Sequence, residues 1–300
     1  MQKYDLSFIK NQLLAIGLKK GDLISLGVSF KKLRRINGGP KKIIDCILEI
    51  IGSSGSLIAP AYTKAYPIWA VYAGLTPVFD VKNTKSNTGG LSEILMNEYH
   101  AIRSTHPTNS MVGIGQFAKK ILSEHTSASA AYSPYSKLAA NNGFLLNIGI
   151  GDSLVGLRHE AQSICGLLRI YQFRRGVKYR AQNEDIKIFW RHDIGGCVKK
   201  MNIITHEMKK LNLINNGVVA DADAIMVNAR VALNFLVNKL SNEIELYLCE
   251  ELNCLFCRKV DKYLNSINAP TSPAHSKIGL MRIFLNKIKH IFMCYIHFDK

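Results

Sequence analysis

The chain has 300 residues, of which 47% are apolar and 20% are charged, so it can bury the core of one large domain or of two small ones. Its 39 Lys and Arg outweigh 22 Asp and Glu to give a formal net charge of +17, which favours anionic partners such as nucleic acid, anionic lipid or phosphorylated cofactors. Because no stretch approaches the roughly 20 uncharged apolar residues that span a bilayer, and the N-terminus lacks a signal-peptide core, we expect a cytoplasmic protein.

The first part of the chain alternates between strand-like and helix-like segments. Short apolar runs bounded by glycine occupy residues 22–29, 55–63 and 144–150, as buried strands would. Isoleucines recur at helical spacing within residues 43–51, between the first two runs. A strand, a helix and a strand in this order predict an α/β fold with layers of helices on a sheet.

The second part of the chain, which begins near Tyr171, continues this α/β character. Its regular segments are a strand-like one at 187–193, helix-like ones at 199–211 and 228–240, and a strand-like one at 243–248. Glycine and proline are scattered instead of collecting into a linker, so we expect a single large domain over residues 1–268.

The chain changes in character beyond this domain, and we expect a loop and a basic amphipathic tail over residues 269–300. Residues 269–276 read APTSPAHS, which predicts the loop, and residues 280–296 carry an amphipathic pattern with a basic face, which predicts a helix. Such a helix is suited to docking on the protein, on a second copy or on another partner chain, and also to lying on an anionic membrane surface.

A basic loop follows the first predicted strand. Residues 31–42 read KKLRRINGGPKK, with six basic side chains, among them Lys31, Lys32 and Arg34, and no acidic one. The two glycines let backbone amides approach a ligand closely, and the helix N-terminus that follows adds a partial positive charge, so the segment predicts a phosphate-binding loop. A solvated basic turn is the alternative. A nucleic-acid site is less well supported, because the segment has no aromatic side chain to stack on bases.

Two histidines stand in segments suited to chemistry. His159 lies in a predicted helix directly after the strand end GIGD, where ligands bind in α/β folds. A histidine there can remove a proton from an attacking amine near neutral pH if a neighbour fixes its tautomer. Gln162 lies at helical spacing i+3, whereas Glu160 points about 100° away around the helix. His106 precedes a proline and is expected in a loop. A purely structural role is the alternative for either histidine.

Several segments together resemble the aminoglycoside 3-N-acetyltransferase family, also known as the antibiotic N-acetyltransferases. The matching features are, in chain order, Ser29, Gly38, Gly39, Pro60, Thr63, Asp80, Gly89, Arg103, Ser104, His106, Pro107, Ser110, Gly115, the segments SPYSKL and GFLLNIGIG, and His159. The resemblance is clear over roughly residues 15–165 and fades toward the C-terminus. It implies a layered α/β/α-type single large domain, followed here by the amphipathic helical tail.

The resemblance also implies an activity. The chain would transfer an acetyl or other acyl group from acetyl-CoA or another acyl-CoA to an amine of an aminoglycoside or amino sugar, with a histidine as general base and no covalent intermediate. The implied residues are His159, Gln162 and His106 for catalysis; Ser29, Lys31, Lys32, Arg34, Gly38, Gly39 and Ser110 for the cofactor; and Asp80 and Glu160 for the acceptor.

The sequence departs from the family pattern at the residues around His159, including the one expected to orient its ring. The family pattern Thr-x-x-His-x-x-Glu reads Gly156, His159 and Gln162 here. A neutral amide can hold a tautomer by hydrogen bonding, but it cannot stabilise an imidazolium electrostatically. Either another acid, such as Glu160 or Asp152, takes over, or the chain is a catalytically lapsed member of the family.

The net charge bears on the choice of acceptor. Aminoglycosides are polycations, which a protein of charge +17 repels unless acidic side chains gather around the acceptor site. A nucleotide-linked or otherwise anionic amino sugar fits the charge better. A basic protein that binds nucleic acid or anionic lipid is the alternative from a different class, although such a protein has no reason to carry the ordered series of motifs.

The seven cysteines are too thinly spread for a secreted disulfide scaffold, so most are expected as reduced thiols. Cys249, Cys254 and Cys257 form a C-x4-C-x2-C pattern, and Cys197 follows two glycines, so four thiolates can in principle meet around a tetrahedral zinc. Such a zinc would be structural, because a closed four-thiolate site leaves no open position. Burial as plain thiols is the alternative, given the Leu and Phe around the sulfurs.

Overall fold

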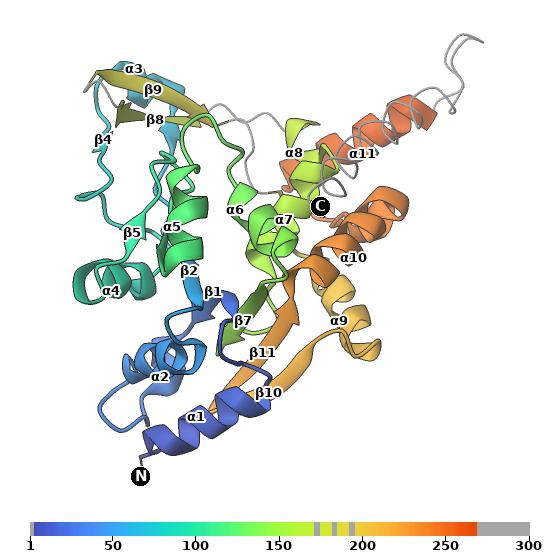
Figure 1. Cartoon of the computed structure of the whole chain (residues 1–300). Coiled ribbons are helices and arrows are strands. Elements are labelled where there is room, and N and C mark those ends of the chain that lie inside the picture. Colours follow the sequence, from blue (N-terminus) through green and yellow to red (C-terminus); the bar gives the residue numbers. More distant parts are fainter. Residues whose placement is uncertain (1–2, 171–174, 182–184, 192–195, 269–300) are drawn as a thin grey trace, which may run out of the picture.

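The computed structural model describes residues 3–170, 175–181, 185–191 and 196–268. Within them, a main sheet of seven strands carries helices on both faces, and a smaller sheet lies at one end of the molecule (Figure 1). This layered architecture confirms the predicted α/β fold class. The domain boundary at residue 268 stays a prediction, because the expected loop and amphipathic tail lie outside the described residues.

The main sheet is built around three parallel strands. In spatial order, the strands found in the described residues are β10 (Asn215–Val219), β11 (Ala222–Asn228), β7 (Phe144–Ile148), β1 (Leu23–Val28), β2 (Ser56–Pro60), β6 (Met111–Ile114) and β5 (Ile102–Arg103). β7, β1 and β2 run parallel, whereas β11 and β6 pair antiparallel with their neighbours. The C-terminal ends of the three parallel strands therefore meet at one edge of the sheet.

Side chains alternate between two cores along the central strands. In β7, Leu145 belongs to the core on one face of the sheet, and Leu146 and Ile148 belong to the core on the other. In β2, Ile58 faces the first core and Leu57 the second. Because successive side chains of a strand point to opposite faces, this alternation gives three layers of structure.

In the part of the chain that the structure describes, three helices cover the second core. They are α1 (Leu6–Ala15), α2 (Lys42–Ile51) and α4 (Gly90–Glu98). α2 confirms the helix expected over residues 43–51, and its isoleucines at the predicted spacing are fully buried. A stripe of this kind supplies most of the stability of a short helix, because propensity alone is marginal at this length.

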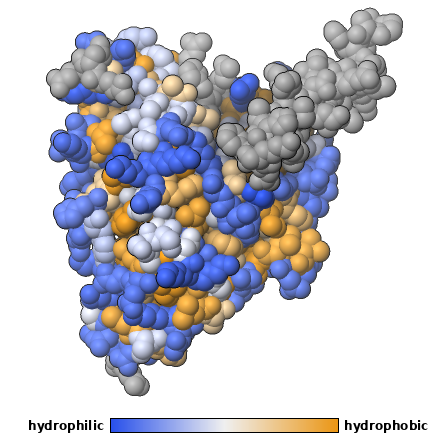
Figure 2. All heavy atoms as spheres, in the orientation of Figure 1, coloured by the Kyte–Doolittle hydropathy of each residue, from blue (hydrophilic) through white to orange (hydrophobic). Residues whose placement is uncertain are grey.

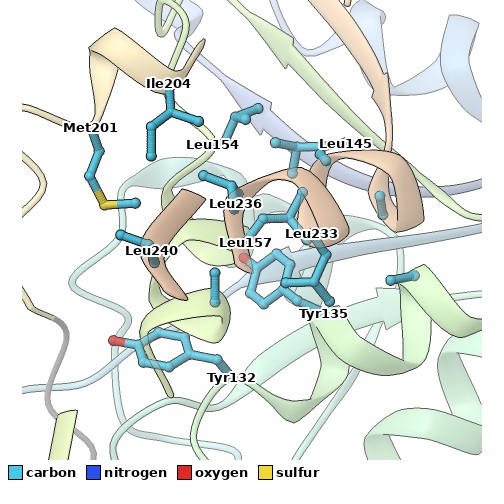
Figure 3. Packing of buried hydrophobic residues seen from close by; sticks show 14 of the residues in the cluster. Tyr132, Tyr135, Leu145, Leu154, Leu157, Met201, Ile204, Leu233, Leu236 and Leu240 are labelled. Atoms are coloured by element: carbon cyan, nitrogen blue, oxygen red, sulfur yellow. The ribbon is translucent and has the colours of Figure 1, made fainter. Parts of the chain in front are cut away.

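The first core is larger and carries most of the helices. They are α5 (Gln116–Ser123), α6 (Ser133–Ala140), α7 (Val155–Ile164), α8 (Leu167–Ile170), α9 (Asn202–Lys210), α10 (Ala229–Asn242) and α11 (Leu255–Asn268). Figure 3 shows how residues such as Leu157 of α7 and Leu233 and Leu236 of α10 meet in this core. Asn228 caps the N-terminus of α10: its Oδ1 accepts hydrogen bonds from the amides two and three residues later, at 3.0 and 3.1 Å.

The smaller sheet stands apart from α1 and α2 in Figure 1. It contains β3 (Tyr66–Pro67), β4 (Val78–Phe79), β8 (Arg175–Arg180) and β9 (Ile186–Arg191), with α3 (Ile68–Tyr72) against it. β9 confirms the strand expected at 187–193 as far as Arg191, since residues 192–193 lie outside the described part. Gly176 in β8 leaves room for the indole of Trp190, which a Cβ would approach to 2.6 Å.

One predicted strand is wrong. Residues 243–248 do not form a strand; they contain a 3-10 helix, η2 (Ile244–Tyr247), directly after α10. Ile244 and Tyr247 are both buried and lie three residues apart, whereas Leu246 is 61% exposed. The burial period is therefore three, as in a 3-10 helix, and the apparent alternation of the sequence was misleading.

The surface is mixed in character. In Figure 2, hydrophilic side chains cover most of the described surface in view, with apolar side chains in smaller groups between them. None of the helices in the described part of the chain combines the length and apolar character that crossing a bilayer requires.

Candidate active site

His159 lies on α7, whose first residue follows the C-terminal end of β7 by way of a short loop. Its Nδ1 lies 3.0 Å from Oε1 of Gln162, one helical turn later. The Gln162 amide is oriented by its other partners. Its Nε2 donates to the carbonyl of Cys197 at 2.8 Å, and its Oε1 accepts the Gly196 amide at 3.2 Å.

This network assigns the tautomer of His159. Because Oε1 of Gln162 is an acceptor, the ring nitrogen that faces it must donate, so the proton sits on Nδ1. The other nitrogen, Nε2, then carries the lone pair. The side chain thus has the arrangement of a general base whose tautomer is fixed by a neighbour.

Burial is the main cause of a lowered pKa at His159. Desolvation, opposed in part by the Gln162 hydrogen bond and reinforced by Arg158 and Arg191, lowers the pKa of His159 to about 4. The imidazole is therefore neutral at pH 7 and can accept a proton.

Two tyrosine rings pack beside this histidine. The ring of Tyr132, which precedes α6, lies 5.1 Å from the His159 ring at an angle of 33°. Tyr62, in the segment after β2, meets Tyr132 edge to face at 6.2 Å. The pattern of the sequence did not single out either tyrosine, because an isolated tyrosine carries no spacing signal.

His106 lies in the loop between β5 and β6, as expected, and it is fully buried. Its Nδ1 accepts the amides of Thr108 at 3.3 Å and Asn109 at 3.0 Å, which places its proton on Nε2. Its ring stacks on His125 at 4.8 Å and meets Phe189 edge to face at 5.1 Å. Desolvation lowers the pKa of His106 to about 3 and that of His125 to about 4. This geometry suits a turn-forming residue, and a catalytic role for His106 stays a prediction.

The two acids considered as substitutes for the family carboxylate have other partners. Glu160, which is buried, accepts a hydrogen bond from the hydroxyl of Ser136 on α6. Asp152 pairs with Lys209 at 2.6 Å on the surface. Neither is the partner of His159 Nδ1, which is Gln162.

The basic loop lies at the same edge of the sheet as α7. Ser29 follows β1, and its amide donates to the carbonyl of Ile148 at the end of β7, at 2.9 Å. A Cβ at Gly149, the next residue, would lie 3.2 Å from Cδ of Lys32. The loop and the start of the α7 segment are therefore neighbours at the C-terminal ends of β1 and β7, where α/β folds bind ligands.

Three of the six basic side chains of this loop have acidic partners. Arg35 pairs with Asp221, Lys41 with Glu98 and Lys42 with Asp45. Lys31, Lys32 and Arg34 have no ion pair with any described residue and are exposed. Gly38 and Gly39 have φ of +78° and +95°, and a Cβ at Gly39 would meet nothing within 4 Å. The loop therefore presents unpaired cations beside open space.

Ser110 and Asp80, predicted to contact cofactor and acceptor, make hydrogen bonds within the protein. Ser110 is buried, and its hydroxyl donates to the Ala61 carbonyl at 2.8 Å and accepts from Arg103 Nε at 3.0 Å. Asp80 accepts the amides of Lys82 and Asn83 at 2.9 and 2.7 Å and so forms a turn. Contacts of either residue with a ligand stay predictions.

The four cysteines that can in principle surround a zinc lie close together, and zinc binding itself stays a prediction. The sulfurs of Cys197, Cys249, Cys254 and Cys257 all lie within 4.8 Å of one another. All four are free thiols, of which Cys257 is buried and the others are half-buried. A link that sequence patterns could not reveal is that Cys197 also supplies the carbonyl that orients Gln162.

Comparisons with known proteins match most of the chain. A family model described as aminoglycoside 3-N-acetyltransferase matches residues 26–241. Aminoglycoside N(3)-acetyltransferase IX of Micromonospora chalcea is 24% identical over 266 residues, which cover 80% of this chain and 94% of that protein.

Solved structures share the fold. AAC-IIIb in a binary complex with CoASH superposes with a TM-score of 0.68 at 21% identity, over 80% of this chain and 97% of that one. A variant of aminoglycoside acetyltransferase AAC(3)-IVa in complex with a gentamicin gives a TM-score of 0.72 at 19% identity, over 87% of this chain and 98% of that one.

Proposed function

The chain belongs to the aminoglycoside 3-N-acetyltransferase family, and from this premise we propose that it transfers an acetyl group from acetyl-CoA to an amine of an aminoglycoside or amino sugar. The observation that carries the proposal is the hydrogen bond between His159 and Gln162, which leaves Nε2 of a neutral imidazole as a proton acceptor. The unpaired cations of the basic loop lie at the same edge of the sheet.

His159 acts as general base in this scheme. Nε2 removes a proton from the attacking amine while the amine nitrogen bonds to the thioester carbonyl carbon. The carbon–sulfur bond then breaks, and the imidazolium returns its proton to the departing thiolate, so no covalent intermediate with the protein forms. Backbone amides near Ser29 stabilise the negative charge that develops on the carbonyl oxygen.

The basic loop binds the donor. Lys31, Lys32 and Arg34 would contact the phosphates of acetyl-CoA, and the open space beside Gly39 would let the pantetheine part of the donor approach the backbone closely. Bound acetyl-CoA supplies the thioester that the amine attacks.

Gln162 in place of a carboxylate should lower the rate constant of acetyl transfer. Its amide holds His159 in the productive tautomer, but it carries no charge to stabilise the imidazolium of the transition state. We therefore expect an active enzyme with a smaller rate constant than a His-carboxylate pair would give. A catalytically lapsed member is the remaining alternative.

The proposal is tested by following release of CoA thiol with a panel of acceptors that contains gentamicin, apramycin, sisomicin and nucleotide-linked amino sugars. At least one acceptor should give turnover, and His159→Ala should lower kcat by about 10²- to 10⁴-fold, the usual contribution of a general base. A wild-type rate in His159→Ala would rule out the proposed base.

Donor binding is tested by calorimetry with acetyl-CoA. The double variant Lys31→Ala/Lys32→Ala should bind at least about tenfold more weakly, since each charge-assisted hydrogen bond contributes about 1.5–3 kcal/mol. The matched control is Lys19→Ala/Lys20→Ala, which removes the same charge just before β1, at the opposite edge of the sheet. Equal affinities of the two double variants would contradict the assignment of the loop. No binding to the wild type would favour tests against nucleic acid and lipid.

A further inference from the structure

Four cysteine side chains from segments far apart in the sequence converge at one place beside the candidate active site. Cys197 precedes α9, Cys249 follows η2, Cys254 stands just before α11, and Cys257 lies in the first turn of α11. The proposed acetyl transfer makes no use of these thiols.

The arrangement fits a tetrahedral metal site. Zinc–sulfur bonds of about 2.3 Å place the four sulfurs of a tetrahedron about 3.8 Å apart. The sulfurs here lie within 4.8 Å of one another, so small rotations of the side chains close the tetrahedron. Four soft thiolates in this geometry select zinc or iron over magnesium or calcium.

Backbone amides support the thiolates. The Cys249 amide donates to Sγ of Cys257 at 3.2 Å, and the Lys199 amide donates to Sγ of Cys197 at 3.5 Å. Hydrogen bonds to sulfur stabilise its charged form, which is the form that binds metal. A Zn²⁺ ion would supply two positive charges, which offset part of the mutual repulsion of four converging thiolates.

The same cluster reaches His159 through one residue. The Gln162 amide is held between the Gly196 amide and the Cys197 carbonyl, and it holds His159 in turn. A Cβ at Gly196 would lie 2.6 Å from the ring of Phe256 on α11 and 2.8 Å from Oε1 of Gln162. The segment at 196–197 is therefore pressed between α11, which carries Cys257, and the partner of the histidine.

We propose that Cys197, Cys249, Cys254 and Cys257 bind one structural zinc ion, which anchors the segment that positions Gln162 and thereby fixes the tautomer of His159. Binding of zinc is independent of the proposed function. The fixing of the His159 tautomer rests on the proposed function only where it is measured through catalysis. In this scheme Gln162 is a positioning residue.

Metal analysis of the purified full chain tests the first part. We expect about one zinc per chain, as for a closed structural site. Cys254→Ser should lose zinc to a competing chelator at a concentration at which wild type retains it, and Cys46→Ser, which changes a buried cysteine outside the cluster, should retain it. Because Cys254→Ser can fail to fold, wild type exchanged with Co²⁺ should also show the absorption of tetrahedral thiolate coordination. Absence of metal, or iron in place of zinc, would overturn the assignment.

Nitrogen NMR of the histidine rings tests the second part without any assay of activity. With zinc bound, the resonances of His159, identified by their loss in His159→Gln, should be those of the Nδ1–H tautomer. Removal of zinc should convert them to a mixture of tautomers and should lower kcat with KM for acetyl-CoA unchanged. Unchanged tautomer signals after complete removal of zinc would refute the positioning role even if zinc binds. If neither the zinc-bound nor the zinc-free protein transferred an acetyl group, the proposed function alone would be refuted.

Discussion

At Gln162, a single amide satisfies three neighbours that a carboxylate cannot satisfy together. Its oxygen accepts from the His159 ring and the Gly196 amide, and its nitrogen donates to the Cys197 carbonyl. A glutamate would place its second oxygen against that carbonyl, with no proton between them. The departure from the family pattern is therefore matched to the local structure and is not simply the loss of a charge.

We predict that Gln162→Glu lowers the free energy of unfolding at pH 7 by about 1–3 kcal/mol, the cost of leaving a buried polar group unsatisfied. Urea denaturation provides the measurement. The matched control is Gln12→Glu, since Gln12 is only half-buried and a glutamate oxygen can still accept the Ala220 amide, which Oε1 of Gln12 accepts at 2.8 Å. That control should change stability by less than about 0.5 kcal/mol. Equal effects of the two substitutions would contradict the role given to the Cys197 carbonyl.

At the scale of elements, α7 packs against α6 at Gly156, where there is no side chain to keep the Tyr135 ring away. A Cβ at Gly156 would lie 1.9 Å from Cζ of Tyr135, whose ring occupies the space that a side chain at this position would need. Figure 3 shows Tyr135 beside Leu157 in this core. The second departure from the family pattern is thus explained by the packing of two helices, and it helps set the position of His159.

We predict that Gly156→Ala lowers stability by about 1–3 kcal/mol or more, because a methyl group in this packed core forces the Tyr135 ring or α7 to move. Gly90→Ala, at the first residue of α4, is the control, since its Cβ would meet nothing within 4 Å. There alanine should be neutral or slightly stabilising. Thermal denaturation of both variants separates the two outcomes, and a Gly156→Ala protein as stable as wild type would contradict this account of the packing.

At the scale of the whole molecule, the net charge of +17 acts on donor and acceptor in opposite ways. It attracts anionic acetyl-CoA and repels polycationic aminoglycosides, and both effects weaken as salt shortens the Debye length to about 10 Å at 0.1 M. Asp152 pairs with Lys209, so its charge is offset within the protein and offers little compensation to a cationic acceptor.

We predict that raising the salt concentration from about 0.01 to 0.2 M raises KM for acetyl-CoA and for a nucleotide-linked amino sugar, and lowers KM for an aminoglycoside. Steady-state kinetics at fixed pH provides the measurement, with a neutral amino sugar as the acceptor control. A KM for the aminoglycoside that rises with salt would indicate an acidic acceptor site and contradict this repulsion.

Much of the fold could be predicted because its signals are local. The spacing of apolar residues predicts which of them are buried. This holds for the isoleucines of α2 and for the glycine-bounded runs of β1, β2 and β7. The hairpin of β10 and β11 has no clear sequence signal, because β10 reads NNGVV and is largely exposed. The 3-10 helix η2 was mistaken for a strand, because four residues are too few for periods of two and three to be told apart.

Sequence patterns were enough to predict the α/β class and the family. They also gave the candidate site residues: a histidine on a helix after a strand, a basic loop after another strand, and four cysteines that could in principle meet. These depend on spacing along the chain. The folded structure was needed to learn which of the six loop cations are paired, that neither Glu160 nor Asp152 bonds to His159 Nδ1, and that Cys197 connects the thiol cluster to Gln162. Apart from the Lys42–Asp45 pair, those contacts join residues tens to nearly two hundred positions apart. No local pattern encodes such contacts, because they arise only when the layers of the fold pack together.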